Sequence, residues 1–154
     1  MNENNLCYSL KTPVLFLVFN RPNETDQVFR KIRNAKPQRL YVASDGPRQA
    51  VDGENEVIKK VREIVTNIDW SCEVKTLFRD KNLGCKYAVS EAIDWFFENE
   101  EQGIILEDDC LPSHSFFKFC EDLLDKYKNN SQVGMISGCN LTNYIKTDQS
   151  YFFS

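Results

Sequence analysis

The chain has 154 residues, about the size of one domain, and 42% of them are hydrophobic, enough to bury a core. Its 19 Lys and Arg residues against 23 Asp and Glu residues give a formal charge of -4, without the basic excess of a nucleic-acid-binding surface. The longest apolar run, residues 14–19, is far shorter than the roughly 20 residues that span a bilayer. We therefore expect one domain with no nucleic-acid partner and no transmembrane segment.

The cysteines and the first residues of the chain indicate a cellular compartment. The 6 cysteines are scattered without a C-x-x-C pair, which fits neither a zinc site nor a compact disulfide scaffold. Residues 1–14 lack the basic start and apolar stretch of a secretory signal. We expect reduced thiols in a cytoplasmic protein, with peripheral contact at the inner membrane as an alternative.

The first half of the chain predicts two strands and two helices. Residues 13–19 form a continuous β-branched and aromatic run, typical of a strand buried on both faces. Asn23 can cap a helix in which apolar residues recur at helical spacing until Pro37. Residues 40–43 predict the second strand. After a polar loop, the apolar face of residues 57–68 predicts the second helix.

The second half continues the alternation of strands and helices. Residues 72–78 predict a third strand, and residues 84–96 predict a helix with an apolar face. Residues 103–106 form a short apolar strand that leads directly into three carboxylates. Pro112 suits the first turn of the next helix, and residues 133–137 predict a fifth strand.

This order predicts an α/β fold with an open, mostly parallel sheet and helices on both faces. We expect residues 1–12 to be an N-terminal extension and residues 13–154 to form the domain. Ligands of such sheets bind outside the carboxyl ends of the strands. Polar residues follow four of the predicted strands and are expected along this edge. They are Asn20 and Arg21; Asp45 and Gly46; Arg79, Lys81 and Asn82; and Glu107, Asp108 and Asp109.

The three consecutive carboxylates at residues 107–109 are the strongest local feature. Adjacent carboxylates after a buried strand repel one another and lose hydration unless a cation compensates them. Mg²⁺ or Mn²⁺ takes one or two protein carboxylates and fills its other positions with water and phosphate oxygens. The sequence therefore indicates a divalent metal site. The alternative is that these acids cap the helix near Pro112, where the helix dipole favours negative charge.

The other polar sets allow a binding role or a plain structural one. Asp45 can accept hydrogen bonds from a base or ribose, although Asp-Gly-Pro is also ordinary turn chemistry. The Arg21 guanidinium suits a phosphate or the acidic cluster, and its alternative is a solvated loop arginine. The set formed by Arg79, Lys81 and Asn82 precedes a helix N-terminus and can offer donors to an anion, or form ordinary surface charge.

Three other classes of enzyme find no support in the sequence. His114 is the only histidine, and nothing near it in the sequence suggests a Ser-His or Cys-His pair. No G-x-G-x-x-G follows the first strand and no P-loop sequence is present, which disfavours a dinucleotide dehydrogenase and a P-loop enzyme.

Four motifs in order resemble the GT-A glycosyltransferases, most closely bacterial relatives of the N-acetylglucosaminyltransferase I group. The motifs are Val-Phe-Asn-Arg-Pro at 18–22, Ser-Asp-Gly-Pro-Arg at 44–48, Arg-Asp-Lys-Asn-Leu-Gly-Cys at 79–85 and Ile-Leu-Glu-Asp-Asp-Cys at 105–110. The resemblance covers roughly residues 13–140. It implies a Rossmann-like, three-layer α/β/α fold and transfer of a hexose or N-acetylhexosamine from a UDP-sugar to an acceptor hydroxyl.

The resemblance also implies roles for individual residues. It assigns Asp109 to Mn²⁺ or Mg²⁺ bound to the diphosphate, and Glu107 and Asp108 to the sugar or ribose side. It assigns Asp45 to recognition of uracil and Arg21 to the nucleotide and its phosphates. The same nucleotide-sugar site would include Asn20, Gly46, Arg79, Lys81 and Asn82.

The acceptor side of the reaction is expected outside this chain. Complete enzymes of the family continue beyond the metal motif with a half that binds the acceptor and supplies the general base. We therefore expect a domain truncated at its C-terminus, with no catalytic base of its own and an unidentified glycan or lipid-linked acceptor. The relatives imply inversion at the anomeric carbon. The alternatives are a non-catalytic nucleotide-sugar-binding fragment and a sugar nucleotidyltransferase, although a Gly-rich basic loop after the first strand is missing.

Overall fold

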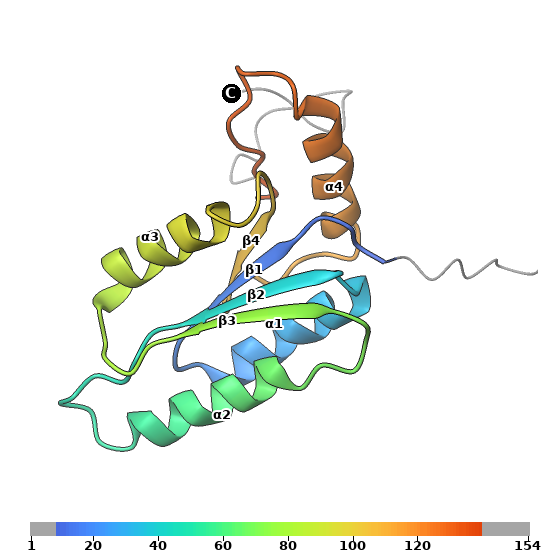
Figure 1. Cartoon of the computed structure of the whole chain (residues 1–154). Helices are drawn as coiled ribbons and strands as arrows, with labels where there is room; N and C mark the ends of the chain where they lie inside the picture. Colours follow the sequence, from blue (N-terminus) through green and yellow to red (C-terminus); the bar gives the residue numbers. More distant parts are fainter. Residues whose placement is uncertain (1–8, 140–154) are drawn as a thin grey trace, which may run out of the picture.

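The computed structural model describes residues 9–139 and forms one open sheet flanked by helices (Figure 1). Its elements in chain order are β1 (Val14–Val18), α1 (Pro22–Ala35), β2 (Arg39–Ser44), α2 (Glu54–Thr66), β3 (Glu73–Phe78), α3 (Gly84–Phe97), β4 (Ile104–Glu107) and α4 (Phe116–Tyr127). The predicted alternation of strands and helices is confirmed from β1 to α4. The expected N-terminal extension lies mostly outside the described residues.

The sheet has the order β3-β2-β1-β4, and all neighbouring strands are parallel. Val14 at the start of β1 is in register with Leu40 of β2 on one side and Ile104 of β4 on the other. β1 is therefore a central strand, and all its residues are buried. A parallel strand covered on both faces needs apolar side chains in both directions, which explains its continuous hydrophobic run.

Alternate side chains of β1 point into two separate apolar clusters on the two faces of the sheet. Phe16 packs against Phe29 of α1, with ring centroids 6.4 Å apart, in the cluster that α2 and α4 also join. Leu15 and Leu17 enter the second cluster with Phe96 of α3. Figure 1 shows α1 and α2 on one side of the sheet and α3 on the other. The α/β class and the helices on both faces agree with the prediction and are compatible with a Rossmann-like fold.

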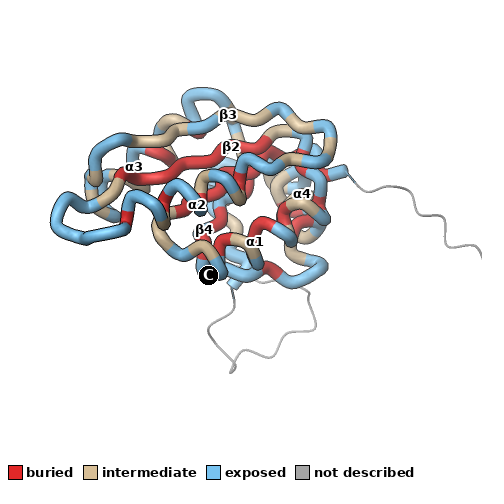
Figure 2. Tube along the Cα trace, turned by 90° about the horizontal axis from the view of Figure 1, so that it is seen from below, coloured by how far each residue is buried: buried red, intermediate tan, exposed pale blue. Residues whose placement is uncertain are grey.

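The strand order places a reversal of the chain between β1 and β4. The chain moves outward from β1 to β2 and β3, and α3 then returns it across the sheet to β4, beside β1. The carboxyl ends of β1 and β4 are therefore adjacent, and ligands of open α/β sheets bind outside the carboxyl ends of such strands. Figure 2 shows buried residues along β2, and intermediate or exposed residues along β3 at the edge of the sheet.

The predicted starts of two helices were wrong. Asn23 does not cap α1, because the helix already begins at Pro22 and Arg21 is its N-cap, without a capping side-chain hydrogen bond. The fixed φ of proline suits this first helical position. Pro112 lies before α4 rather than in its first turn, since α4 begins at Phe116.

The predicted fifth strand at residues 133–137 is not formed; this segment has neither helix nor strand. Gly138 lies so close to Phe116 that an added Cβ would be 2.3 Å from the ring. The segment therefore packs against the start of α4. Its hydrophobic residues satisfied the sequence pattern, but a strand also requires a neighbour that shares its backbone hydrogen bonds.

None of the helices in residues 9–139 is both long and apolar enough to cross a membrane. The cysteines of the same range are free thiols, and only Cys120 is buried. Burial raises the pKa of the Cys120 thiol to about 11.

Candidate functional site

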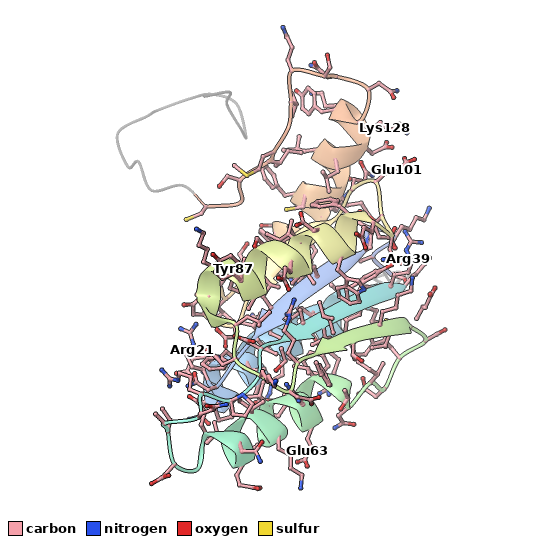
Figure 3. The ribbon with its side chains drawn as sticks, turned by 60° about the vertical axis from the view of Figure 1, so that its left-hand side comes forward. Arg21, Arg39, Glu63, Tyr87, Glu101 and Lys128 are labelled. Atoms are coloured by element: carbon pink, nitrogen blue, oxygen red, sulfur yellow. The ribbon has the colours of Figure 1, made fainter. Side chains whose placement is uncertain are left out.

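A cavity of about 420 Å³ opens at the carboxyl ends of the strands. Figure 3 shows Arg21 at this end of the sheet and Arg39, which begins β2, at the opposite end. Residues that follow all four strands contribute to the cavity, together with the first turns of α3. Its lining includes Phe19, Arg21, Asp45, Arg48, Arg79, Asn82, Gly84, Cys85, Glu107 and Asp108.

Arg21 links the ends of β1 and β4 through two carboxylates. Its Nη2 lies 2.6 Å from Oδ1 of Asp108, and its Nη1 lies 2.8 Å from Oδ2 of Asp109. The backbone N–H of Phe19 also donates to Oδ2 of Asp108 at 3.3 Å. The two carboxylates have different surroundings, because the side chain of Asp108 is only 3% exposed and that of Asp109 is 48% exposed.

These surroundings shift the pKa values of the two acids in opposite directions. Burial raises the pKa of Asp108, although the charge of Arg21 and the Phe19 N–H oppose this shift. The hydrogen bond from Arg21 lowers the pKa of Asp109, and the same bond raises the pKa of Arg21. The adjacent carboxylates were expected to need a cation that offsets their repulsion. The Arg21 guanidinium supplies this positive charge from within the chain.

The two carboxylates at Arg21 could hold a divalent metal only together with oxygens of a bound phosphate group. Within residues 9–139, no group of three or more His, Cys, Asp or Glu side chains is arranged to bind a metal ion. Asp108 and Asp109 both pair with Arg21, and their carboxylates therefore lie close together. Glu107 is exposed. One or two carboxylates are enough for Mg²⁺ or Mn²⁺ when phosphate oxygens complete the coordination. The alternative that these acids cap α4 is wrong, because its first turn contains no acid.

Asp45 joins the end of β2 to the start of α3. Its Oδ1 accepts hydrogen bonds from the N–H groups of Gly46 at 2.9 Å and Leu83 at 3.0 Å. Its Oδ2 accepts from the N–H of Gly84 and from Nδ2 of Asn82, both at 3.0 Å. This carboxylate is buried and satisfies free N–H groups at the N-terminus of α3. Residues 45–48 form no turn, so Asp45 holds the start of α3 and also lines the cavity.

Gly46 permits the loops after β2 and β3 to touch. A Cβ at this position would lie 2.5 Å from the backbone N and C atoms of Lys81. Asn82 reinforces the contact by donating to the carbonyl oxygen of Gly46 at 2.9 Å. Lys81 itself is exposed and outside the cavity lining. Gly46 and Asn82 therefore shape this wall of the cavity, and of the two only Asn82 lines it.

The remaining predicted residues occupy different positions. Arg79 lines the cavity, is mostly buried, and pairs with Glu91 of α3 at 3.2 Å. Asn20 is outside the lining, and its Nδ2 donates to Oε1 of Glu54 at 2.9 Å. His114 is exposed and also outside the lining. The structure therefore brings most, but not all, of the predicted residues to one cavity.

The pair formed by Arg48 and Glu54 was not predicted from the sequence. Glu54, the buried first residue of α2, accepts hydrogen bonds from the backbone N–H of Arg48 at 2.7 Å and from its guanidinium. These bonds lower the pKa of Glu54 to about 2. The Arg48 guanidinium lies 5.6 Å from the centre of the Phe19 ring, and both residues line the cavity. Arg48 ended a recognised motif, but no spacing in the sequence indicates its partner.

Arg62 was also missed, because it occupies an ordinary position on α2. It is half-buried, and its guanidinium donates to the carbonyl oxygens of Asp45 at 3.2 Å and Arg79 at 2.6 Å. Its Nε also donates to Oγ of Ser44 at 3.1 Å. Burial lowers the pKa of Arg62. This side chain fixes the ends of β2 and β3, and so the spacing of the loops around the cavity.

The cavity combines an apolar floor with charged residues at its edge. Leu17, Val18, Ala43, Ala88 and Val89 form the floor between β1, β2 and α3. Three guanidinium groups and three carboxylates also line it. This arrangement can hold a flat, weakly polar group beside an anionic one. No protein-family model matches the chain, and no curated protein shows significant similarity to it.

Proposed function

We propose that this chain is the donor-binding domain of a metal-dependent glycosyltransferase with a three-layer GT-A fold and binds a UDP-sugar. One observation carries the proposal. Residues that follow all four strands meet in one cavity at the carboxyl ends, beside the reversal between β1 and β4. Nucleotide ligands of parallel sheets bind at such a position. The order of the four sequence motifs supports the assignment to sugar transfer.

The two ends of the cavity suit the two parts of a nucleotide diphosphate. The apolar floor under α3 accommodates the base, and the edge near Arg21 accommodates the phosphates. The metal would be held by Asp109, with Asp108 beside it, and would neutralise charge on the departing diphosphate. Glu107, which is exposed and lines the same edge, is the proposed contact to the sugar.

Asp45 is the proposed contact to uracil, provided that one of its oxygens can accept a further hydrogen bond. Both of its oxygens already accept hydrogen bonds from within the chain. A carboxylate offers about four lone-pair sites, so a base N–H would have to share an oxygen with one of these donors. The internal bonds also hold the first turn of α3, where Gly84 and Cys85 line the cavity.

The complete reaction would transfer a hexose or N-acetylhexosamine from UDP to an acceptor hydroxyl. The acceptor would be a glycan or a lipid-linked sugar, and the general base would come from outside the described residues. We place the reaction in the cytoplasm, with peripheral contact at the inner membrane as the alternative. Arg21 and the floor of the cavity then serve to bind and orient the donor.

Calorimetric titration of UDP tests the donor site. The wild-type chain is expected to bind UDP with Mn²⁺ present and at least about tenfold more weakly without it, because the ion bridges the diphosphate to Asp109. Asp109→Ala should abolish the dependence on Mn²⁺. Asp125→Ala is the matched control, since it removes an exposed acid from the end of α4. Absence of UDP binding to the folded chain under both conditions would contradict the proposal.

Product analysis separates transfer from the alternatives. Release of UDP from a UDP-sugar in the presence of acceptor indicates a transferase, and binding without release indicates a non-catalytic domain. Release of pyrophosphate from UTP and a sugar 1-phosphate indicates a nucleotidyltransferase. The same Asp109→Ala variant tests in each case whether the activity depends on this cavity.

A further inference from the structure

The two links made by Arg21 differ in how easily they can be broken. The link to Asp108 joins the guanidinium to a buried carboxylate that also accepts the N–H of Phe19. The link to Asp109 joins two side chains that are 44% and 48% exposed. Breaking the first would leave a buried charge without its partner, whereas the second exchanges readily with solvent. Arg21 can therefore release Asp109 while it stays anchored to Asp108.

The position of Arg21 indicates where its released nitrogen would go. Arg21 and Asp108 line the cavity, whereas Asp109 is outside the lining. A guanidinium nitrogen donates equally well to a carboxylate oxygen and to a phosphate oxygen. A phosphate in the cavity therefore offers Nη1 of Arg21 a new acceptor and frees Oδ2 of Asp109. Without a phosphate, a divalent cation must compete with the guanidinium for this carboxylate.

We propose that Arg21 is an exchangeable counter-ion that occupies Asp109 until a phosphate of the nucleotide replaces it. The site then takes the divalent cation and the diphosphate together rather than the cation first. Asp108 is a positioning residue that holds Arg21 between its two partners. This inference rests on the proposed function, because it needs the diphosphate and the cation to share the site.

The test measures Mn²⁺ alone and UDP with Mn²⁺ on the same variants. Arg21→Ala should bind Mn²⁺ alone about fivefold more tightly than the wild type, as expected when a competing exposed ion pair is removed. The same variant should bind UDP with Mn²⁺ about tenfold more weakly, because a charged hydrogen bond to phosphate is lost. Arg30→Ala is the matched control, since it removes an exposed ion-paired arginine from α1. It should change neither affinity.

A second variant protects the test against loss of the fold. Arg21→Ala leaves the buried Asp108 carboxylate without its cation, so the double variant Arg21→Ala with Asp108→Asn removes that charge as well. It should also bind Mn²⁺ alone more tightly than the wild type. Uridine, which lacks phosphates, should bind equally to the wild type and to Arg21→Ala. A parallel loss of uridine binding would overturn the assignment of Arg21 to the phosphates.

The two proposals fail in different ways. If the wild type binds UDP with Mn²⁺ but neither Arg21 variant gains affinity for Mn²⁺ alone, the counter-ion inference is wrong and the donor site stands. If neither the wild type nor any variant binds UDP, but the affinity for Mn²⁺ alone still rises in both Arg21 variants, competition at Asp109 is supported. The exchange for phosphate is then overturned together with the donor site. If neither UDP binding nor a gain in Mn²⁺ affinity is seen, both proposals are overturned.

Discussion

Asp108 and Asp109 show how the fold gives adjacent residues of one type different chemistry. Asp108 points into the protein, where burial raises its pKa, and Asp109 is half-exposed, where Arg21 lowers its pKa. The sequence presents them as equal members of an acidic cluster. Both residues lie in the turn after β4 and contact the same guanidinium, but only Asp108 is packed into the interior. Of these two residues, Asp109 is consequently the one whose carboxylate is open to solvent.

Gly46 carries a prediction at the scale of a single residue. Gly46→Ala should lower the free energy of unfolding by about 1 to 3 kcal/mol, because the new methyl group meets the backbone of Lys81 and cannot be relieved by a side-chain rotation. Urea denaturation measures this change. Gly134→Ala is the control, since an added Cβ there has nothing within 4 Å, and it should be nearly neutral. Equal stability of the two variants would show that the loops after β2 and β3 can move apart without loss of stability, which would contradict this prediction.

At the scale of elements, the segment between β2 and α2 is fixed by one buried carboxylate. Glu54 begins α2 and binds Arg48 on this segment and Asn20 after β1. Three parts of the chain thereby meet at the first turn of one helix. The acidic residue also suits the helix N-terminus, where the helix dipole favours negative charge. The position of Arg48 in the cavity thus depends on Glu54.

This pair predicts a dependence of stability on pH. The folded pKa of Glu54 is lowered to about 2, so its contribution is complete above the unfolded value and is lost as the pH falls toward 2. The free energy of unfolding should therefore decrease between about pH 5 and pH 2. Glu54→Gln should show a shallower decrease, measured by urea denaturation across this range. Glu56→Gln, an exposed acid of the same helix, should keep the wild-type slope.

At the scale of the whole molecule, the two faces of the sheet are covered unequally. The cluster under α1, α2 and α4 contains most of the buried residues, and the cluster under α3 is much smaller. Along α3, only Ala92 and Phe96 are fully buried, whereas α1 buries residues along its whole length. The cavity lies under the first turns of α3. The helix that covers the cavity is therefore the one with fewer buried residues.

This asymmetry predicts the order of local opening. Amide hydrogens of α3 should exchange with solvent faster than those of α1, because fewer buried contacts oppose local unfolding of α3. Hydrogen exchange measured by mass spectrometry checks this difference. UDP with Mn²⁺ should slow exchange in the first turns of α3 and leave α1 nearly unchanged. Equal exchange of the two helices in the free protein would contradict this account.

Most of the fold could be predicted because local patterns decide it. The run at residues 13–19 predicted β1, and the apolar face at 84–96 predicted α3. The segment at 133–137 has similar composition but forms no strand, because pairing depends on a neighbour and not on hydrophobicity. The Arg48–Glu54 pair could not be predicted, since nothing in its spacing distinguishes it from surface charge.

The amino-acid sequence by itself determined the elements from β1 to α4, the parallel sheet and the edge at which polar residues gather. Hydrophobic periodicity fixes such features, because each strand or helix must bury its apolar face. Only the tertiary structure decided which charges meet. Arg21 and Asp109 are 88 residues apart in the chain, and they pair because the strand order places β4 beside β1. Electrostatic partners depend on distance in space, which the order of residues along the chain does not specify.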